Sequence, residues 1–346
     1  NLARVDYDGT ASSLLAEPQR TNLFTYSEDF TQWTKSNASS INTITSTVIS
    51  PDGVSYANKL YPIGSATSSY IRQGAAGDCF SMFIKKGERR WVLIYGGFAN
   101  SNVWFDSENG VFGWVLVGAT ATVESFGNDW YKIKILWTQN STNVRVYNTD
   151  SGTSTQSTGN GTDGIYIWGA QLEQGSYATS YIPTDGSTVT RVQDQYSKTG
   201  ISNLINSEEG VLFVEMAALV EVDANRRFIT LNDGGASNNV VLRYEATGVI
   251  TARYQVGGVA QCSIAFATTI TNSHKIAFKY KENDFALWVD GTEIGTDTSG
   301  SVLAADTINK ISFDSGNGSF PLFAKVKQLQ VFKTALTDTE LATLTT

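Results

Sequence analysis

The residues that come nearest to a catalytic pair are Glu221 and Asp223, in the segment Glu-Val-Asp-Ala-Asn-Arg over 221–226. Alternate residues of a β-strand point to the same face, so two carboxylates with this spacing could face one sugar. Hydrolysis of a glycosidic bond needs two carboxyl groups at a set separation. The position where a further glutamate would complete the strand holds Arg226. We therefore expect a solvated strand end here and no two-carboxylate hydrolase.

A polysaccharide lyase would need a base that removes the proton next to a carboxylate and a group that neutralises this carboxylate. The base would be a tyrosine or a histidine, and the single histidine is His274. His274 follows Thr-Asn-Ser, which is typical of a turn, so a strand-end role is favoured. Tyrosines and arginines are too numerous to define one pair, and they include Arg72, Tyr95, Arg145, Arg243, Tyr244 and Arg253. A polysaccharide lyase remains an alternative function, but the sequence defines no base and neutralising group for it.

Metal sites are the next class of chemistry. One histidine and no Cys-x-x-Cys motif make a zinc site unexpected. Calcium, the one cofactor considered, prefers Asp and Asn oxygens, and the candidate ligands are Asn232, Asp233 and Asp106. Both surrounding segments are also rich in the residues that form tight turns. A turn without a metal is the favoured interpretation.

Sugar binding is the chemistry that the aromatic content favours. Pyranose rings stack on aromatic faces, while amide, carboxylate and guanidinium groups bind the hydroxyls. Seven of the eight tryptophans precede residue 170. Those in apolar strands are expected in the core, whereas others lie nearer to turns. The candidate glycan-binding residues are Tyr95, Trp104, Trp114 and Trp130 in the first half and Arg243, Tyr244 and Arg253 in the second.

Length and composition limit the function classes. The 346 residues exceed what one core usually holds, which predicts two domains. The net charge of −8 argues against a phosphate-backbone ligand, so no nucleic-acid partner is expected. No run of about 18 apolar residues exists, so we expect no membrane insertion. Cys79 and Cys262 fall in different predicted domains and are expected to be free and buried. The chain begins at Asn1 without a methionine, which suggests a fragment or a processed product.

The pattern of short apolar runs predicts an all-β fold. In Asp78–Lys85, Phe80, Met82 and Ile84 alternate with Cys79, Ser81 and Phe83, which indicates a strand between two packed layers. Asp290-Gly291 between two alternating runs predicts a type I′ hairpin. Thr337-Asp-Thr-Glu340 predicts a capping box and a short C-terminal helix.

Two widely separated segments bracket the first half of the chain. They are Glu17-Pro-Gln-Arg-Thr-Asn-Leu23 and Gly169–Thr184, with Val189-Thr-Arg191 following. With Arg4-Val-Asp-Tyr7 ahead of them, these segments resemble a module of tailed-bacteriophage structural proteins, especially tail fibres and other virion appendages. The resemblance implies a jelly roll similar in build to carbohydrate-binding modules. It also implies a virion location, other virion proteins as partners and a homotrimer.

The second half shows another resemblance. Its strands, the Val289-Asp-Gly291 hairpin, the late strand ending in Val331-Phe332 and the segment Ala335–Leu341 resemble concanavalin A-like, laminin-G-type jelly rolls. The resemblance covers Gly210–Thr346 and concerns the fold more than the ligand.

Together these features predict two tandem antiparallel jelly-roll β-sandwiches and a short C-terminal helix. The expected boundaries are 1–184 for the first domain, 185–209 for a linker and 210–346 for the second domain. The expected function is that of a non-enzymatic virion component, a tail-fibre or receptor-binding part that binds host-surface or extracellular glycans. The alternatives are a polysaccharide lyase or depolymerase, and a purely structural spacer or decoration protein.

Overall fold

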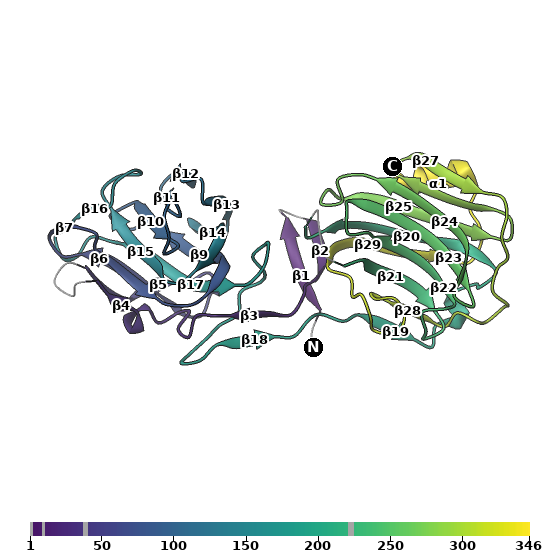
Figure 1. Ribbon diagram of the computed structural model, residues 1–346, viewed down its shortest axis with the longest axis horizontal. Helices are drawn as coiled ribbons and strands as arrows, with labels where there is room; N and C mark the ends of the chain where they lie inside the picture. The colour runs from purple at the N-terminus through teal and green to yellow at the C-terminus, as the bar shows by residue number, and fades with distance from the viewer. Residues whose placement is uncertain (1–2, 9–10, 37–40, 221–224) are drawn as a thin grey trace. The chain divides into compact units, whose positions relative to one another are not determined.

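The computed structural model describes residues 3–8, 11–36, 41–220 and 225–346. Glu221 and Asp223 lie outside the described residues. The described chain is nearly all β, with antiparallel pairing throughout the described sheets, and it divides into two compact units. Unit 1 comprises Asn1–Pro18 and Gln193–Thr346, and unit 2 comprises Gln19–Val192. The prediction of two antiparallel β-sandwiches is confirmed (Figure 1).

Unit 2 contains two six-stranded sheets. The strands of its first sheet are, in spatial order, β12 (Val111–Val115), β11 (Val103–Asp106), β10 (Trp91–Tyr95), β15 (Val144–Thr149), β8 (Tyr70–Gln73) and β4 (Thr34–Lys35). Those of the second are β13 (Ala119–Ser125), β14 (Trp130–Ser141), β9 (Gly77–Lys85), β17 (Ile165–Glu173), β6 (Tyr56–Pro62) and β5 (Ile41–Ile49). The smaller elements are β3 (Arg20–Asn22), β7 (Ser65–Thr67), β16 (Gln156–Thr158), β18 (Val189–Arg191) and the 3₁₀ helix η1 (Phe30–Gln32).

The alternation predicted for β9 is confirmed by burial. Phe80, Met82 and Ile84 lie in the main core of unit 2, whereas Phe83 packs in a separate cluster on the opposite face. Both faces of this central strand are therefore covered. Cys79 and Cys262 are buried and free, as predicted.

Unit 1 contains a seven-stranded and a six-stranded sheet. The seven strands are β1 (Arg4–Asp8), β2 (Ala11–Ala16), β29 (Ala324–Phe332), β20 (Glu209–Ala218), β25 (His274–Lys281), β26 (Phe285–Val289) and β27 (Thr292–Asp297). The six are β19 (Ser197–Thr199), β28 (Lys310–Ser312), β21 (Arg227–Asn232), β22 (Asn239–Tyr244), β23 (Val249–Val256) and β24 (Val259–Ala267). The 3₁₀ helix η2 (Ser202–Leu204) and the helix α1 (Asp338–Thr345) complete the unit.

The two local predictions in unit 1 are confirmed. Asp290 and Gly291 both have positive φ, 49° and 77°, as a type I′ turn requires. Thr337 and Glu340 form the capping box of α1, with each side chain accepting a hydrogen bond from the other residue's backbone amide. Both signals depend on neighbours in the chain, which is why the sequence reveals them.

The observed domain limits differ from the predicted ones. Strand β2 pairs with β29 through Leu14↔Val326 and Ala16↔Ala324, so the first eighteen residues belong to the sandwich of the C-terminal half. The predicted linker 185–209 also divides, because β18 pairs with β3 of unit 2 and β19 pairs with β28 of unit 1. Unit 2 is thus inserted between β2 and β19 of unit 1. Pairing across some 300 residues leaves no local trace in the sequence.

The two bracketing segments form a hydrogen-bonded clasp in unit 2. The Asn22 side-chain amide donates to the carbonyls of Ala170 and Ile182, at 3.2 and 2.9 Å. Its oxygen accepts from the amides of Phe24 and Leu172, both at 3.2 Å. Asn22 is fully buried, so these bonds satisfy a polar side chain that would otherwise destabilise the unit.

Gln171 and Glu173 extend the clasp to the chain that leaves β17. The Gln171 side-chain oxygen accepts from the Ile182 amide at 2.7 Å, and Glu173 accepts from the Thr179 amide at 2.9 Å. Both side chains are fully buried. The residues that mark the resemblance therefore have an architectural role here.

Candidate functional site

The outer face of the first sheet of unit 2 carries side chains that alternate with the core. On β10 and β15, Val92 and Val146 point into the core, so Tyr95 and Arg145 point outward. The strand pairing aligns these outward side chains in two rows across the sheet. One row is Trp104, Leu93, Tyr147 and Tyr70; the other is Tyr95, Arg145 and Arg72. We call Tyr70, Arg72, Tyr95, Trp114 and Arg145 the Tyr–Arg face.

The first row forms a small apolar cluster beneath the Tyr–Arg face. Leu93, Trp104 and Tyr147 are buried there, with Tyr70 and Tyr95 packed against them. Tyr70 and Tyr147 have ring centroids 4.9 Å apart. The cluster fixes the tyrosines of the face, because neighbouring rings restrict their rotamers.

Arg145 is held between two aromatic rings. Its guanidinium carbon lies 4.6 Å from the centroid of the Tyr70 ring and 4.9 Å from that of Tyr95. Partial burial lowers the pKa of Arg145, but the hydrogen bond to Tyr147 and the neighbouring phenols outweigh it and raise the pKa above the ordinary value. Cation–π contacts of this kind are worth about 0.5–1 kcal/mol at exposed sites. The Arg145 guanidinium is therefore a cation held in position by two tyrosine rings.

Trp114 lies beyond the first row on the edge strand. The register of β11 and β12 shifts between Val103 and Phe105, which is a bulge opposite Trp104. Trp114 is 56% exposed, and its ring centroid lies 6.2 Å from that of Trp104. With strands about 4.8 Å apart, β12 with Trp114 and β15 with Arg145 are separated by roughly 14 Å across the sheet.

The glycan-binding residues predicted in the first half differ in their exposure and position. Tyr95, Trp104 and Trp114 lie on one face, but Trp104 is only 3% exposed and donates to the Ser154 carbonyl at 2.8 Å. It supports the face and cannot stack on a ligand. Trp130 is buried on the other sheet, where it packs near Phe83 and donates to the Ile49 carbonyl. This position does not support the prediction that Trp130 contacts a glycan, because apolar side chains around it bury the indole.

Sequence reasoning missed Tyr70, and it named Arg72 and Arg145 only among the arginines that a lyase could use. The signal was present as alternation in Tyr70-Ile71-Arg72, where the buried Ile71 places both neighbours outward. What the sequence does not contain is the register that sets Arg72 opposite Arg145.

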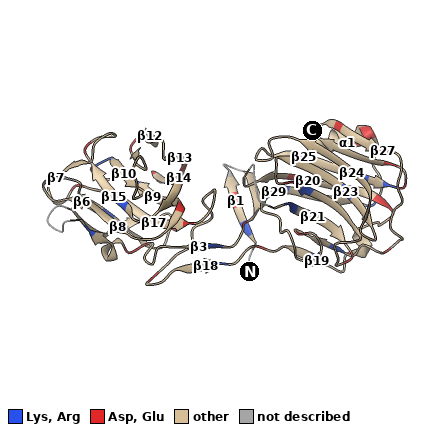
Figure 2. Ribbon diagram, viewed as in Figure 1, with Lys and Arg blue, Asp and Glu red and all other residues tan. Residues whose placement is uncertain are grey.

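The second predicted group, in unit 1, does not form an equivalent face. Tyr244 lies in the core and donates to the Met216 carbonyl at 3.1 Å, so it is unavailable to a ligand. Arg243 and Arg253 lie on the opposite, outer side of their sheet, since they alternate with Leu242, Ala252 and other core residues. Figure 2 draws Lys and Arg alike in blue, including those of this sheet.

Arg243 is largely neutralised by Glu245. Its guanidinium donates to a Glu245 carboxylate oxygen at 2.6 Å and lies 5.3 Å from the Phe228 ring. Arg226 binds the other Glu245 oxygen at 2.7 Å. Burial raises the pKa of Glu245, but the hydrogen bonds and charges of Arg243, Thr251 and Arg226 lower it below the ordinary value. We call Arg226, Arg243, Glu245 and Arg253 the Arg–Glu face.

The candidate calcium ligands are engaged in hydrogen bonds or an ion pair within their own units. Asn232 is fully buried and its amide donates to Thr230 and Ser312, while Asp233 accepts from Gly235 and Asn238 within a turn. Asp106 lies in unit 2 and pairs with Arg90 at 2.9 Å. Across the described ranges, no group of three acidic, histidine or cysteine side chains could hold a metal ion.

His274 has a strand-end environment. Its Nδ1 lies 2.6 Å from an Asp290 carboxylate oxygen, and its Nε2 lies 3.1 Å from the Thr269 carbonyl. Both ring nitrogens are thus engaged inside unit 1, and the ring is largely buried. The histidine has no free nitrogen to act as a base.

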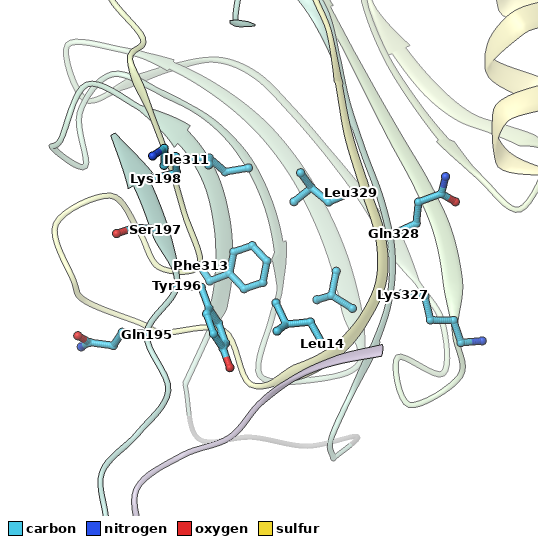
Figure 3. Close-up of a pocket in the computed structure, with 11 residues that line it drawn as sticks. Leu14, Gln195, Tyr196, Ser197, Lys198, Ile311, Phe313, Lys327, Gln328 and Leu329 are labelled. Atoms are coloured by element: carbon cyan, nitrogen blue, oxygen red, sulfur yellow. The ribbon is translucent and has the colours of Figure 1, made fainter. Parts of the chain in front are cut away.

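Unit 1 also contains a pocket of about 510 Å³ at one edge of the sandwich. Its walls come from β2 and β29 on one side and from β19, β28 and Phe313 on the other. Figure 3 shows Leu14, Phe313 and Leu329 pointing toward a common space. The lining contains no carboxylate or histidine, and its ionisable side chains are Tyr196, Lys198 and Lys327.

Among the described residues, no helix has the length and apolar character needed to cross a membrane.

No protein-family model matches the chain, and no curated protein matches it. Solved structures with a similar fold include the CBM40 of Ruminococcus gnavus IT-sialidase bound to α2,3 sialyllactose, at 16% identity and a TM-score of 0.34, covering 44% of this chain and 98% of that one. The NanB sialidase of Streptococcus pneumoniae has 16% identity and a TM-score of 0.35, covering 43% of this chain and 26% of that one. A heptameric SAP-like pentraxin of Limulus polyphemus has 12% identity and a TM-score of 0.34, covering 44% and 74%. These likenesses concern the fold alone.

Proposed function

We propose that this chain binds glycans without cleaving them, and that the Tyr–Arg face of unit 2 is the binding site. The observation that carries the proposal is the position of Arg145, whose guanidinium lies between the rings of Tyr70 and Tyr95 on the outer side of a sheet. Aromatic surfaces and a fixed hydrogen-bond donor are the two elements that a sugar ring needs. Trp114 adds an exposed ring for a second sugar.

The lyase alternative has less support from the same face. It requires a base, a neutralising cation and an acidic residue in contact. Arg145 and Tyr147 are hydrogen-bonded, but no carboxylate of the described residues pairs with either side chain. The face therefore matches recognition better than proton transfer.

A panel of bacterial and algal polysaccharides tests this proposal. The purified chain should be retained on at least one glycan, with no new unsaturated or reducing ends. Trp114→Ala should weaken binding about tenfold. A nucleobase that stacks on an aromatic side chain contributes roughly 1–3 kcal/mol, and we expect a sugar ring on Trp114 to contribute at the lower end of that range. Tyr56→Ala is the matched control, since Tyr56 is 53% exposed on the other sheet of the same unit.

The outcomes separate the three function classes. Unsaturated products would show cleavage and would support the lyase alternative over binding without cleavage. Absence of retention on every glycan would overturn glycan binding and leave a structural role. Equal losses in Trp114→Ala and Tyr56→Ala would remove the Tyr–Arg face from the proposal.

We further propose that the chain is a component of a bacteriophage virion, a tail fibre or receptor-binding part that acts with other virion proteins. The support is the pair of bracketing segments, which resemble those of tailed-phage appendage proteins. Mass spectrometry of purified phage particles should detect the chain, and its absence from them would contradict the proposal. A homotrimer, expected from the same resemblance, is tested by light scattering.

A further inference from the structure

Arg72 and Arg145 lie directly opposite each other on neighbouring strands. The register of β8 and β15 pairs these two residues, and both side chains point to the outer side of the sheet. Like charges in directly opposed positions destabilise a sheet. A pair of this kind therefore has an unfavourable interaction that a bound anion would remove.

The protein supplies no anion for this pair. Within the described part of the chain, neither arginine makes an ion pair, although the whole chain has a net charge of −8. Other arginines of unit 2 are paired: Arg89 with Asp150 and Arg90 with Asp106. Asp150 and Asp106 are thus already engaged by other cations.

Arg145 is also held in place without using all its donors. Its Nε is buried and has no hydrogen-bond partner, and the two tyrosine rings limit the movement of the guanidinium. A guanidinium is planar and binds a carboxylate through two parallel hydrogen bonds. A positioned guanidinium loses little conformational entropy when such a ligand binds.

We propose that the Tyr–Arg face selects saccharides that carry a carboxylate, with Arg145 and Arg72 binding the carboxylate and the aromatic side chains contacting the sugar rings. The inference rests on the proposed glycan-binding function and adds the chemical class of the ligand. The carboxylate removes the repulsion between the two guanidiniums. The tyrosines supply the apolar contact that a free inorganic anion would lack.

Isothermal titration calorimetry with trigalacturonate and its methyl ester tests the charge requirement. The acid should bind, and the ester, which has the same sugar rings, should bind at least tenfold more weakly. Arg145→Gln and Arg72→Gln should each weaken binding of the acid at least tenfold, since each removes a charge-assisted hydrogen bond to the carboxylate. Arg145→Lys should restore part of the loss because it keeps the charge without the bidentate geometry.

Arg253→Gln is the matched control. Arg253 is an outer-face arginine of unit 1 whose Nε also lacks a partner among the described residues. Its loss should leave trigalacturonate binding unchanged, and circular dichroism of every variant should confirm folding. If Arg253→Gln weakens binding as much as Arg145→Gln, the carboxylate is not bound at the Tyr–Arg face.

The results distinguish failure of this inference from failure of the proposed function. If the methyl ester binds as tightly as trigalacturonate, carboxylate selection is overturned. It is also overturned if a sulfated trisaccharide binds as tightly as trigalacturonate. If Trp114→Ala still weakens neutral-glycan binding, the proposed function remains. No saccharide binding of any kind overturns both.

Discussion

The two outer faces, one in each unit, are built from similar residues and differ in how their charges are balanced. The Arg–Glu face of unit 1 places Arg226 and Arg243 on the two oxygens of Glu245. The Tyr–Arg face of unit 2 places Arg145 between tyrosine rings and has no carboxylate partner among the described residues. An arginine that shares a half-buried carboxylate stabilises the fold, whereas one that faces only rings and another arginine remains available to a ligand.

Arg253 is the exception within unit 1. Burial is the main cause that lowers its pKa, and Arg243 and Arg226 lower it further, with only Glu245 opposing them. Three guanidiniums share one carboxylate there, so the Arg–Glu face keeps a net positive charge. Arg243 contacts the single ring of Phe228 and does not lie between two rings as Arg145 does, so we expect the Arg–Glu face to attract small anions without binding sugars.

The largest expected effect is the loss of stability on breaking the Arg–Glu face. Arg243→Ala leaves the half-buried Glu245 with one partner fewer and should lower the free energy of unfolding of unit 1 by about 3 kcal/mol. Arg145→Ala should lower that of unit 2 by about 1–2 kcal/mol, because it removes two cation–π contacts and breaks no ion pair. Differential scanning calorimetry of the full chain measures both. Equal destabilisation would contradict the distinction between the two faces.

A smaller effect is expected from acid. The pKa of Glu245 is lowered in the folded state, so its contribution to stability is present above its ordinary value of 4.5 and is lost as pH falls through the folded value. Unit 1 should therefore become less stable below pH 4.5, and Glu245→Gln should reduce this dependence. The five residues that define the Tyr–Arg face include no carboxylate, so we expect no comparable acid dependence from that face. Thermal unfolding measured between pH 3 and 6 (roughly one unit either side of the carboxyl range) tests the difference.

The smallest expected effect is a gain of anion binding in unit 1. Glu245→Gln removes the carboxylate shared by Arg226 and Arg243 and should increase retention on a sulfated resin at low salt. The gain should disappear near 1 M salt, where the Debye length is about 3 Å. Glu208→Gln is a matched control that removes one carboxylate elsewhere in unit 1. Unchanged retention of Glu245→Gln would contradict the expectation that Glu245 keeps Arg226 and Arg243 from binding other anions.

Local patterns in the sequence were sufficient for many elements. Alternation in β9, the Asp290-Gly291 turn and the capping box of α1 are all specified by residues within a few positions of one another. The aromatic content near turns also identified Tyr95 and Trp114, which lie on one face. Such signals persist because strand and turn geometry impose short periods on the chain.

Burial of individual aromatic residues was less predictable. Trp104 and Trp130 lie near polar turns in the sequence, yet each indole is buried and donates to a distant carbonyl, Ser154 or Ile49. Tyr244 lies in the core although it sits next to Arg243. Which side of a strand faces the core depends on the partner sheet, and alternation alone leaves the choice between two faces open.

The all-β class, the amphipathic strands, the hairpin and the cap follow from the sequence alone, because they depend on side chains close together in the chain. Only the tertiary structure decided that β2 joins β29, that unit 2 is inserted into unit 1, and that Arg72 lies opposite Arg145. The reason is that strand pairing and register are set by contacts between distant segments. The free energy of those contacts is spread over the whole sheet and leaves no short motif.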